Sequence, residues 1–99
     1  MPGLDAHGKM LVKNFQSAFL EEFGVTVRVY HGVKFADGGA TLASVRMKDH
    51  EGGKSCSLHG NMKVKTAEDA VKDALGIKIQ IEDRNGELAD NSVTLGSLR

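Results

Sequence analysis

Two nearly identical stretches of this chain decide its fold: HGKMLVK at residues 7–13 and HGNMKVK at residues 59–65. Five of their seven residues are identical, and the stretches begin 52 positions apart. At the same offset, FGVTVRV at residues 23–29 aligns with LGIKIQI at residues 75–81. Self-similarity at a fixed spacing is typical of repeated structural units. We therefore interpret the chain as an internal duplication.

The similarity resumes after one inserted residue in the second copy. The stretch ADGGATLASVR at residues 36–46 aligns with ADNSVTLGSLR at residues 89–99, with six identities in eleven positions. The insertion falls near Asn85-Gly86, a dipeptide typical of a tight turn. An insertion at a turn is what a true duplication tolerates best.

These alignments predict a single α+β domain over residues 1–99, with two repeats, 7–46 and 59–99, joined by a loop and strand over 47–58. A chain of 99 residues has room for one small core. Its 13 basic and 13 acidic residues cancel, so no overall field attracts nucleic acid or an anionic membrane. The single cysteine, Cys56, excludes an internal disulfide and suits a reducing compartment, which predicts a cytoplasmic protein.

Each repeat is expected to fold as a βαββ unit. Short strands are predicted at Met10–Lys13 and Met62–Lys65, followed by helix N-caps at Asn14 and Thr66. One apolar face with helical spacing then predicts a helix in each repeat. Its residues are Phe15, Ala18, Phe19 and Phe23 in the first repeat, and Ala67, Ala70, Val71, Ala74 and Leu75 in the second.

A glycine, Gly24 or Gly76, is expected to end each helix in the left-handed conformation. Apolar and polar residues then alternate over residues 25–30 and 77–82. This period of two predicts a mixed or antiparallel sheet with both helices on its apolar face. Hairpin turns are predicted at His31-Gly32 and Asn85-Gly86, the second of type I′, with return strands ending at Phe35 and Leu88.

The segments after the hairpins are expected to turn at Asp37 and Asp90 and then to direct a leucine inward. The predicted core is Val27, Val29, Ile79, Ile81, Phe19, Phe23, Val71, Leu75, Leu42 and Leu95. Residues 47–53 are expected to form a loop, and Ser55–Leu58 a strand.

The run YHGVKFADGGATL at residues 30–42 resembles the β-grasp, or ubiquitin-like, family around its third and fourth strands. The resemblance implies a β-grasp-like fold, and in the second repeat it extends from Lys54 to Arg99. The first repeat leaves little room for an opening strand before His7. The Gly-Gly tail of ubiquitin-like modifiers does not follow Leu98, so we expect the fold without conjugation.

Other residue patterns are interpreted as structural. His7 and His59 occupy equivalent positions but lack companions at metal-ligand spacing. Cys56 lacks an orienting third group for nucleophilic catalysis. The repeated pairs Asp37 with Arg46 and Asp90 with Arg99 are expected to cap turns and cover the core edge. No catalytic, cofactor-binding or metal-binding residue is therefore assigned.

The functional prediction is a non-enzymatic protein-interaction module that uses its sheet face or edge strands, as a monomer or homodimer. Arg28, Tyr30 and Lys34 are the candidate partner surface, because the second repeat has Gln80, Glu82 and Glu87 in their places. Such a surface would prefer an acidic partner protein and would not bind a membrane. The alternatives are a nucleic-acid-binding sheet face and a small enzyme with a site between repeats or protomers.

Overall fold

The computed structural model describes residues 3–46 and 55–98 and confirms the α+β class. The first half contains β1 (Gly3–Ala6), α1 (Val12–Phe23), β2 (Val27–His31), β3 (Lys34–Phe35) and the 3-10 turn η1 (Ala43–Val45). The second half contains β4 (Cys56–His59), α2 (Val64–Leu75), β5 (Lys78–Ile81) and the 3-10 turn η2 (Gly96–Leu98). Both halves have the order strand, helix, strand and 3-10 turn, but the first half adds β3. In the second half, the predicted return strand ending at Leu88 is reduced to an isolated bridge between Glu82 and Leu88. The loop predicted at 47–53 lies outside the described residues.

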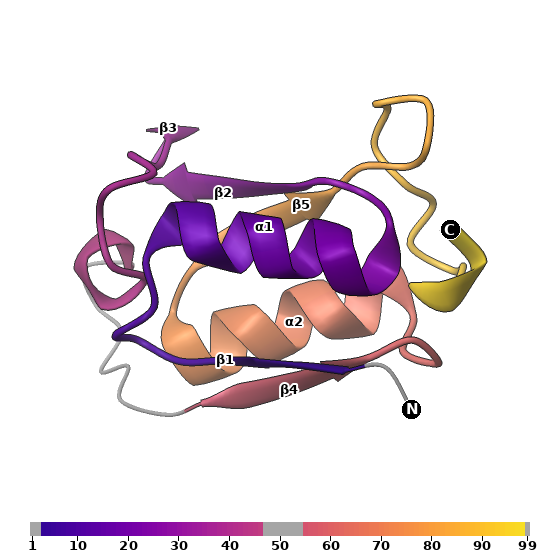
Figure 1. Ribbon diagram of the computed structural model, residues 1–99, viewed down its shortest axis with the longest axis horizontal. Coiled ribbons are helices and arrows are strands. Elements are labelled where there is room, and N and C mark those ends of the chain that lie inside the picture. The colour runs from indigo at the N-terminus through magenta and orange to yellow at the C-terminus, as the bar shows by residue number, and fades with distance from the viewer. Residues whose placement is uncertain (1–2, 47–54, 99) are drawn as a thin grey trace.

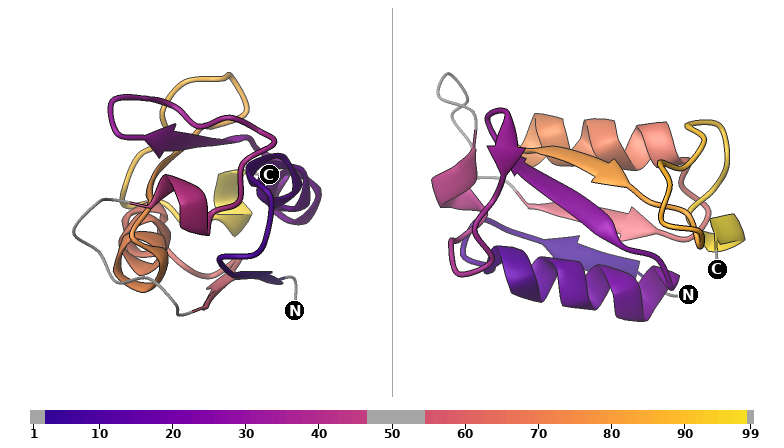
Figure 2. Two further views of the ribbon diagram at one scale, coloured as in Figure 1. Left: turned by 90° about the vertical axis from the view of Figure 1, so that its left-hand side faces the viewer. Right: turned by 90° about the horizontal axis from the view of Figure 1, so that it is seen from above.

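The strands form two antiparallel sheets instead of the one that the pattern predicts. β1 pairs with β4, and a separate three-stranded sheet has the order β3-β2-β5. Both helices lie on the same side of the three-stranded sheet, and the β1–β4 pair lies beyond them (Figure 1). Seen end-on, the helices flank a core that the two sheets close from above and below (Figure 2).

The predicted opening strands, Met10–Lys13 and Met62–Lys65, are wrong. Both helices begin within these segments, at Val12 and Val64, and each segment makes one isolated bridge, through Leu11 to Thr41 and through Lys63 to Thr94. The true opening strands are β1 and β4, which lie earlier in the chain. The expectation of little room before His7 is therefore also wrong.

The predicted N-caps, Asn14 and Thr66, are wrong for a related reason. The N-cap residues are Leu11 and Lys63, and neither makes a side-chain cap bond. Backbone carbonyls from the segment after each hairpin satisfy the first helical N–H groups, as Ala40 does for Val12 at 2.8 Å. In the second repeat, the Val93 carbonyl accepts from the Val64 N–H at 2.9 Å. A long-range backbone contact thus replaces the local side-chain cap.

The predicted helix ends are confirmed. Gly24 and Gly76 have φ angles of 73° and 71°, which a residue with a Cβ adopts only with strain. Their N–H groups donate to the carbonyls of Leu20 and Lys72, so each helix closes on a left-handed glycine.

The two hairpin turns differ in length. Gly32, with φ 67°, and Val33 form a two-residue loop between paired His31 and Lys34, and glycine at the first central position is typical of a type II′ turn. The second hairpin has a three-residue loop, Arg84–Gly86, closed by a bond from the Asp83 N–H to the Glu87 carbonyl.

The type I′ prediction for Asn85-Gly86 is wrong. A type I′ turn needs positive φ at both central residues, and among the described residues positive φ occurs at glycines alone. The Asp83 carboxylate explains the longer loop, because it accepts from the N–H groups of Asn85 at 2.8 Å and Glu87 at 3.1 Å. The longer loop is thus held by the Asp83 side chain.

All ten predicted core residues are buried, including both leucines after the predicted turns, Leu42 and Leu95. The turns themselves form as expected, since the carboxylates of Asp37 and Asp90 accept from the N–H groups of Gly39 and Ser92. The short helices η1 and η2 follow. Other buried apolar residues extend the same core from β1 and β4: Leu4, Ala6 and Leu58.

The strand register places residues that are 52 positions apart in the sequence opposite each other. Asp5 faces Ser57 in the β1–β4 pair, and Arg28 faces Gln80 in the β2–β5 pair. Each pair of residues is separated by the repeat offset of 52. This register is the one expected of two halves related by a twofold axis.

Candidate interaction surface

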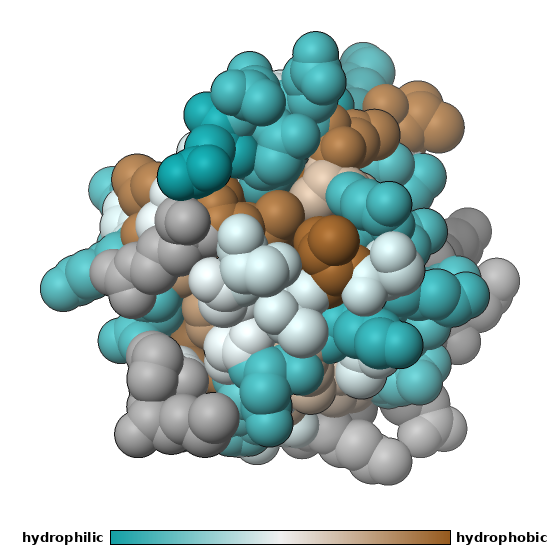
Figure 3. All heavy atoms as spheres, turned by 90° about the vertical axis from the view of Figure 1, so that its right-hand side faces the viewer, coloured by the Kyte–Doolittle hydropathy of each residue, from teal (hydrophilic) through white to brown (hydrophobic). Residues whose placement is uncertain are grey.

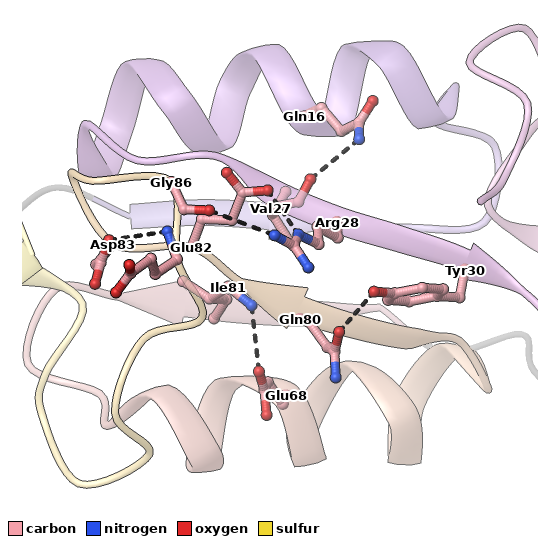
Figure 4. A network of polar contacts seen from close by, with 11 residues as sticks. Gln16, Val27, Arg28, Tyr30, Glu68, Gln80, Ile81, Glu82, Asp83 and Gly86 are labelled. Carbon is pink, nitrogen blue, oxygen red and sulfur yellow. Dashed lines mark hydrogen bonds and ion pairs between the residues drawn. The ribbon is translucent and has the colours of Figure 1, made fainter. Parts of the chain in front are cut away.

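The outer face of the β2–β5 pair carries a connected set of polar side chains. Arg28 donates from Nε to Glu82 Oε2 at 2.7 Å and from Nη2 to the Gly86 carbonyl at 3.4 Å. The Tyr30 hydroxyl donates to Gln80 Oε1 at 2.6 Å (Figure 4). Each of these bonds joins the first repeat to the second, so the network is a seam between the repeats.

The seam changes how the predicted site residues are interpreted. The hydrogen bond with Glu82 is the main cause that raises the pKa of Arg28 above its ordinary value, so the guanidinium stays charged but paired. Tyr30 is committed to Gln80 in the same way. Arg28 and Tyr30 are brought together, yet both are bonded within the domain, whereas the third predicted residue, Lys34, lies exposed in the hairpin strand β3.

Tyr30 also packs against a side chain on each neighbouring strand. Phe35 stacks on Tyr30 with ring centroids 5.2 Å apart and an interplanar angle of 23°. On the opposite neighbouring strand, Lys78 places Nζ 5.5 Å from the centroid of the Tyr30 ring, a cation–π contact. Phe35 and Lys78 are the two cross-strand partners of Tyr30. Tyr30 therefore has a neighbour on each side and is held in place.

The β2–β3 hairpin is the most exposed apolar feature among the described residues. Val33, in the turn, is 96% exposed and Phe35 is 68% exposed. Lys34 lies between them and is also exposed. We define the hairpin surface as Val33, Lys34 and Phe35.

The matching hairpin of the second repeat is polar. Its loop reads Asp83-Arg84-Asn85-Gly86-Glu87, and the counterpart of Phe35 is Leu88, which is 51% exposed. The face of the molecule near this second hairpin shows hydrophobic areas separated by hydrophilic side chains (Figure 3). The apolar tip is thus a feature of the first repeat.

The sequence reasoning missed Val33 and Phe35. It treated Phe35 as the end of a return strand, and it gave Val33 no role. A signal was present, because an apolar residue directly after a turn glycine is unusual in a solvated loop. The exposure of Phe35 could not be predicted from the sequence, because β3 has just two residues and therefore shows no alternation of apolar and polar side chains.

The remaining candidate residues are separated from the hairpin surface. Cys56, in β4, is half-buried, and burial together with the nearby Asp5 charge raises the pKa of its thiol. A thiol in that state is a poor nucleophile at neutral pH. His7 and Arg46 line a cavity of about 580 Å³, which His59 does not line. Arg99, the predicted partner of Asp90, lies outside the described residues.

Within residues 3–46 and 55–98, no group of three or more His, Cys, Asp or Glu residues could hold a metal ion. The helices of the described segments are also too short or too polar to cross a membrane. No family model, curated protein or solved structure matches this chain.

Proposed function

We propose that this domain is a non-enzymatic protein-interaction module that binds its partner through the hairpin surface. The observation that carries the proposal is the exposure of Val33 and Phe35 at one tip, when the other large apolar side chains of the first repeat are mostly buried. Burying exposed apolar side chains against a partner is favourable by about 25 cal/mol per Å². The Tyr30–Phe35 stack supports the surface, because it orders the Phe35 ring before binding.

The charges around the hairpin define the partner more closely. Lys34 lies between the two apolar residues, and Lys78 lies beside Tyr30. Arg28 adds little to this field because Glu82 neutralises it. The preferred partner is therefore a protein with an apolar cleft bordered by acidic side chains. Its binding should weaken with salt, since exposed charges are screened over about 8 Å at physiological ionic strength.

Nucleic-acid binding is the second candidate, and one observation favours it. Two aromatic rings and two lysines gather on one sheet face, as in proteins that stack single-stranded bases. The stacking geometry favours a protein partner instead. Tyr30 is covered by Phe35 on one side and by Lys78 on the other, which leaves the outer face of Phe35 for a base.

We further propose that the domain acts in the cytoplasm, as a monomer or homodimer. The single half-buried thiol of Cys56 supports a reducing compartment. The exposed hairpin surface is accessible in one copy of the chain and needs no second copy to complete it.

The test uses a photo-crosslinking residue at position 33, with mass spectrometry to identify the captured protein. The double variant Val33→Ser/Phe35→Ser should lose capture of that protein, and Lys34→Glu should weaken it. Leu88→Ser is the matched control, because Leu88 is the half-exposed counterpart of Phe35 in the second repeat.

Retained capture by the double variant, or equal loss in Leu88→Ser, would contradict the proposal. Tight binding of a labelled single-stranded RNA, lost in Phe35→Ser, would establish the nucleic-acid candidate instead. NMR spectra of each variant would verify that the fold is unchanged.

A further inference from the structure

A cavity of about 580 Å³ is lined mainly by residues of the first repeat, and none of the described lining residues belongs to the hairpin surface. It is lined by His7, Gly8, Lys9, Thr41, Ala43, Arg46 and Ser55. These residues come from the turn after β1, the segment around η1 and the residue before β4. A cavity of 300–1,000 Å³ is the usual size of a small-molecule site.

Two small residues that line the cavity, Gly8 and Ala43, lie against each other. The Ala43 N–H donates to the Gly8 carbonyl at 3.0 Å, which holds the turn after β1 against η1. A Cβ at Gly8 would lie 3.0 Å from the Ala43 Cβ, so the two backbones are close and have no large side chains between them.

The cavity lining is basic. Lys9 and Arg46 carry permanent positive charges, and His7 adds a third nitrogen group that can donate. Among the residues that the structure describes, none of those lining the cavity is acidic. The nearby carboxylate of Asp5 accepts a hydrogen bond from the Ser57 hydroxyl at 2.6 Å and is thereby directed to β4.

Hydroxyl groups complete the donor set. Thr41 Oγ1 accepts from the Ser44 N–H at 3.2 Å, which leaves the Thr41 hydroxyl hydrogen free to donate to a ligand. Ser55 supplies a second hydroxyl. Guanidinium, ammonium and hydroxyl donors around one space are the chemistry that proteins use for phosphate.

We infer that this cavity binds a small phosphate-bearing molecule. A phosphate dianion matches the two permanent charges of Lys9 and Arg46, and the cavity volume leaves space for the group that carries it. The second repeat provides an internal comparison, because the position of Lys9 is taken there by the neutral Asn61. The inference is independent of the hairpin surface.

The experiment is an NMR titration of the isotope-labelled chain with inorganic phosphate, with acetate at equal ionic strength as the control. Phosphate should shift the backbone amides of Gly8, Lys9, Thr41 and Ala43 and reach saturation, whereas acetate should not. Lys9→Asn, which imports the residue of the second repeat, should weaken phosphate binding by about two- to fivefold. Arg46→Gln should weaken it similarly.

Asn61→Lys is the matched control and should leave the shifts around Gly8 unchanged. Each substituted side chain is exposed, so the fold is expected to persist, and the same spectra check it. Equal effects of acetate, unchanged binding by Lys9→Asn, or shifts of similar size around His59–Asn61 would each overturn the inference.

Discussion

The two helices fill one core with very different side chains. At three equivalent positions α1 presents Phe15, Phe19 and Phe23, whereas α2 presents Ala67, Val71 and Leu75. All six are buried. The phenylalanines also contact each other, with ring centroids 6.1 Å apart for Phe15–Phe19 and 4.8 Å for Phe19–Phe23. Which positions are buried is therefore the same in both repeats, but the volume is supplied mainly by the first.

The hairpins show the same asymmetry on the surface. The first repeat has a short apolar tip at Val33 and Phe35, and the second has a longer loop stabilised by the Asp83 carboxylate. Two repeats in one core need to match where they pack, while exposed positions are free to differ. The comparison thus shows that packing constrains the buried positions, whereas the exposed hairpin residues can differ between the repeats.

The largest expected effect tests the unequal core. Phe19→Ala should cost about 3–5 kcal/mol of unfolding free energy, because it removes a fully buried ring and leaves a cavity. The equivalent change in α2, Val71→Ala, should cost about 1–2.5 kcal/mol, since less volume is lost. Urea denaturation of both variants measures the two values. Equal losses would show that the repeats share the core evenly, and a loss below about 1 kcal/mol at Phe19 would misplace the helix face.

A smaller effect is expected at the close backbone contact between Gly96 and Gly60 in the second repeat. Gly96 donates its N–H to the Gly60 carbonyl at 2.7 Å, and a Cβ at Gly96 would lie 3.0 Å from that oxygen. Gly96→Ala should therefore cost about 1–3 kcal/mol through overpacking. In the first repeat the same position already holds Ala43, so Ala43→Gly should cost about 0.5–1 kcal/mol through chain entropy.

Thermal unfolding of these two variants gives the comparison. A stabilised Gly96→Ala variant would mean that the second repeat can relax to the spacing of the first.

The smallest effect concerns Glu68 in α2, whose counterpart in α1 is Gln16. Gln16 donates from Nε2 to the Val27 carbonyl at 3.0 Å, whereas Glu68 accepts from the Ile81 N–H at 3.3 Å. Burial is the main cause that raises the pKa of Glu68, opposed by the bond from Ile81. Because the folded state holds this proton more tightly, Glu68 favours folding below its unfolded pKa and loses that contribution as pH rises through its folded pKa.

Glu68→Gln should therefore remove this pH dependence and stabilise the domain at neutral pH by less than about 1 kcal/mol, since the carboxyl is partly solvated. The measurement is the unfolding free energy at mildly acidic and neutral pH. Destabilisation at neutral pH would show that the Ile81 bond needs the charged acceptor.

Much of the local structure could be predicted, and the errors share one origin. Gly24 and Gly76 end the helices as expected, because a left-handed C-cap is a local requirement. Asn14 and Thr66 fail as N-caps because distant carbonyls, those of Ala40 and Val93, satisfy the helix starts. The candidate site follows the same rule. The sequence singled out Arg28 and Tyr30. Their hydrogen bonds to Glu82 and Gln80 could not be predicted, because these partners lie on the second repeat, which pairs with β2 only in the folded structure.

The amino-acid sequence by itself determines which residues face the core, because burial follows the apolar period of each helix and strand. The same period occurs in both repeats. The tertiary structure alone decides which strands pair. β1 with β4 and β2 with β5 are pairings between the two halves of the chain. From the sequence pattern, each strand could equally be assigned a partner within its own half. Those pairings bring Glu82 to Arg28 and thereby remove Arg28 from the free surface. Similarly, the meeting of His7, Lys9 and Arg46 at one cavity depends on how the turn after β1 packs against η1, which no local pattern specifies.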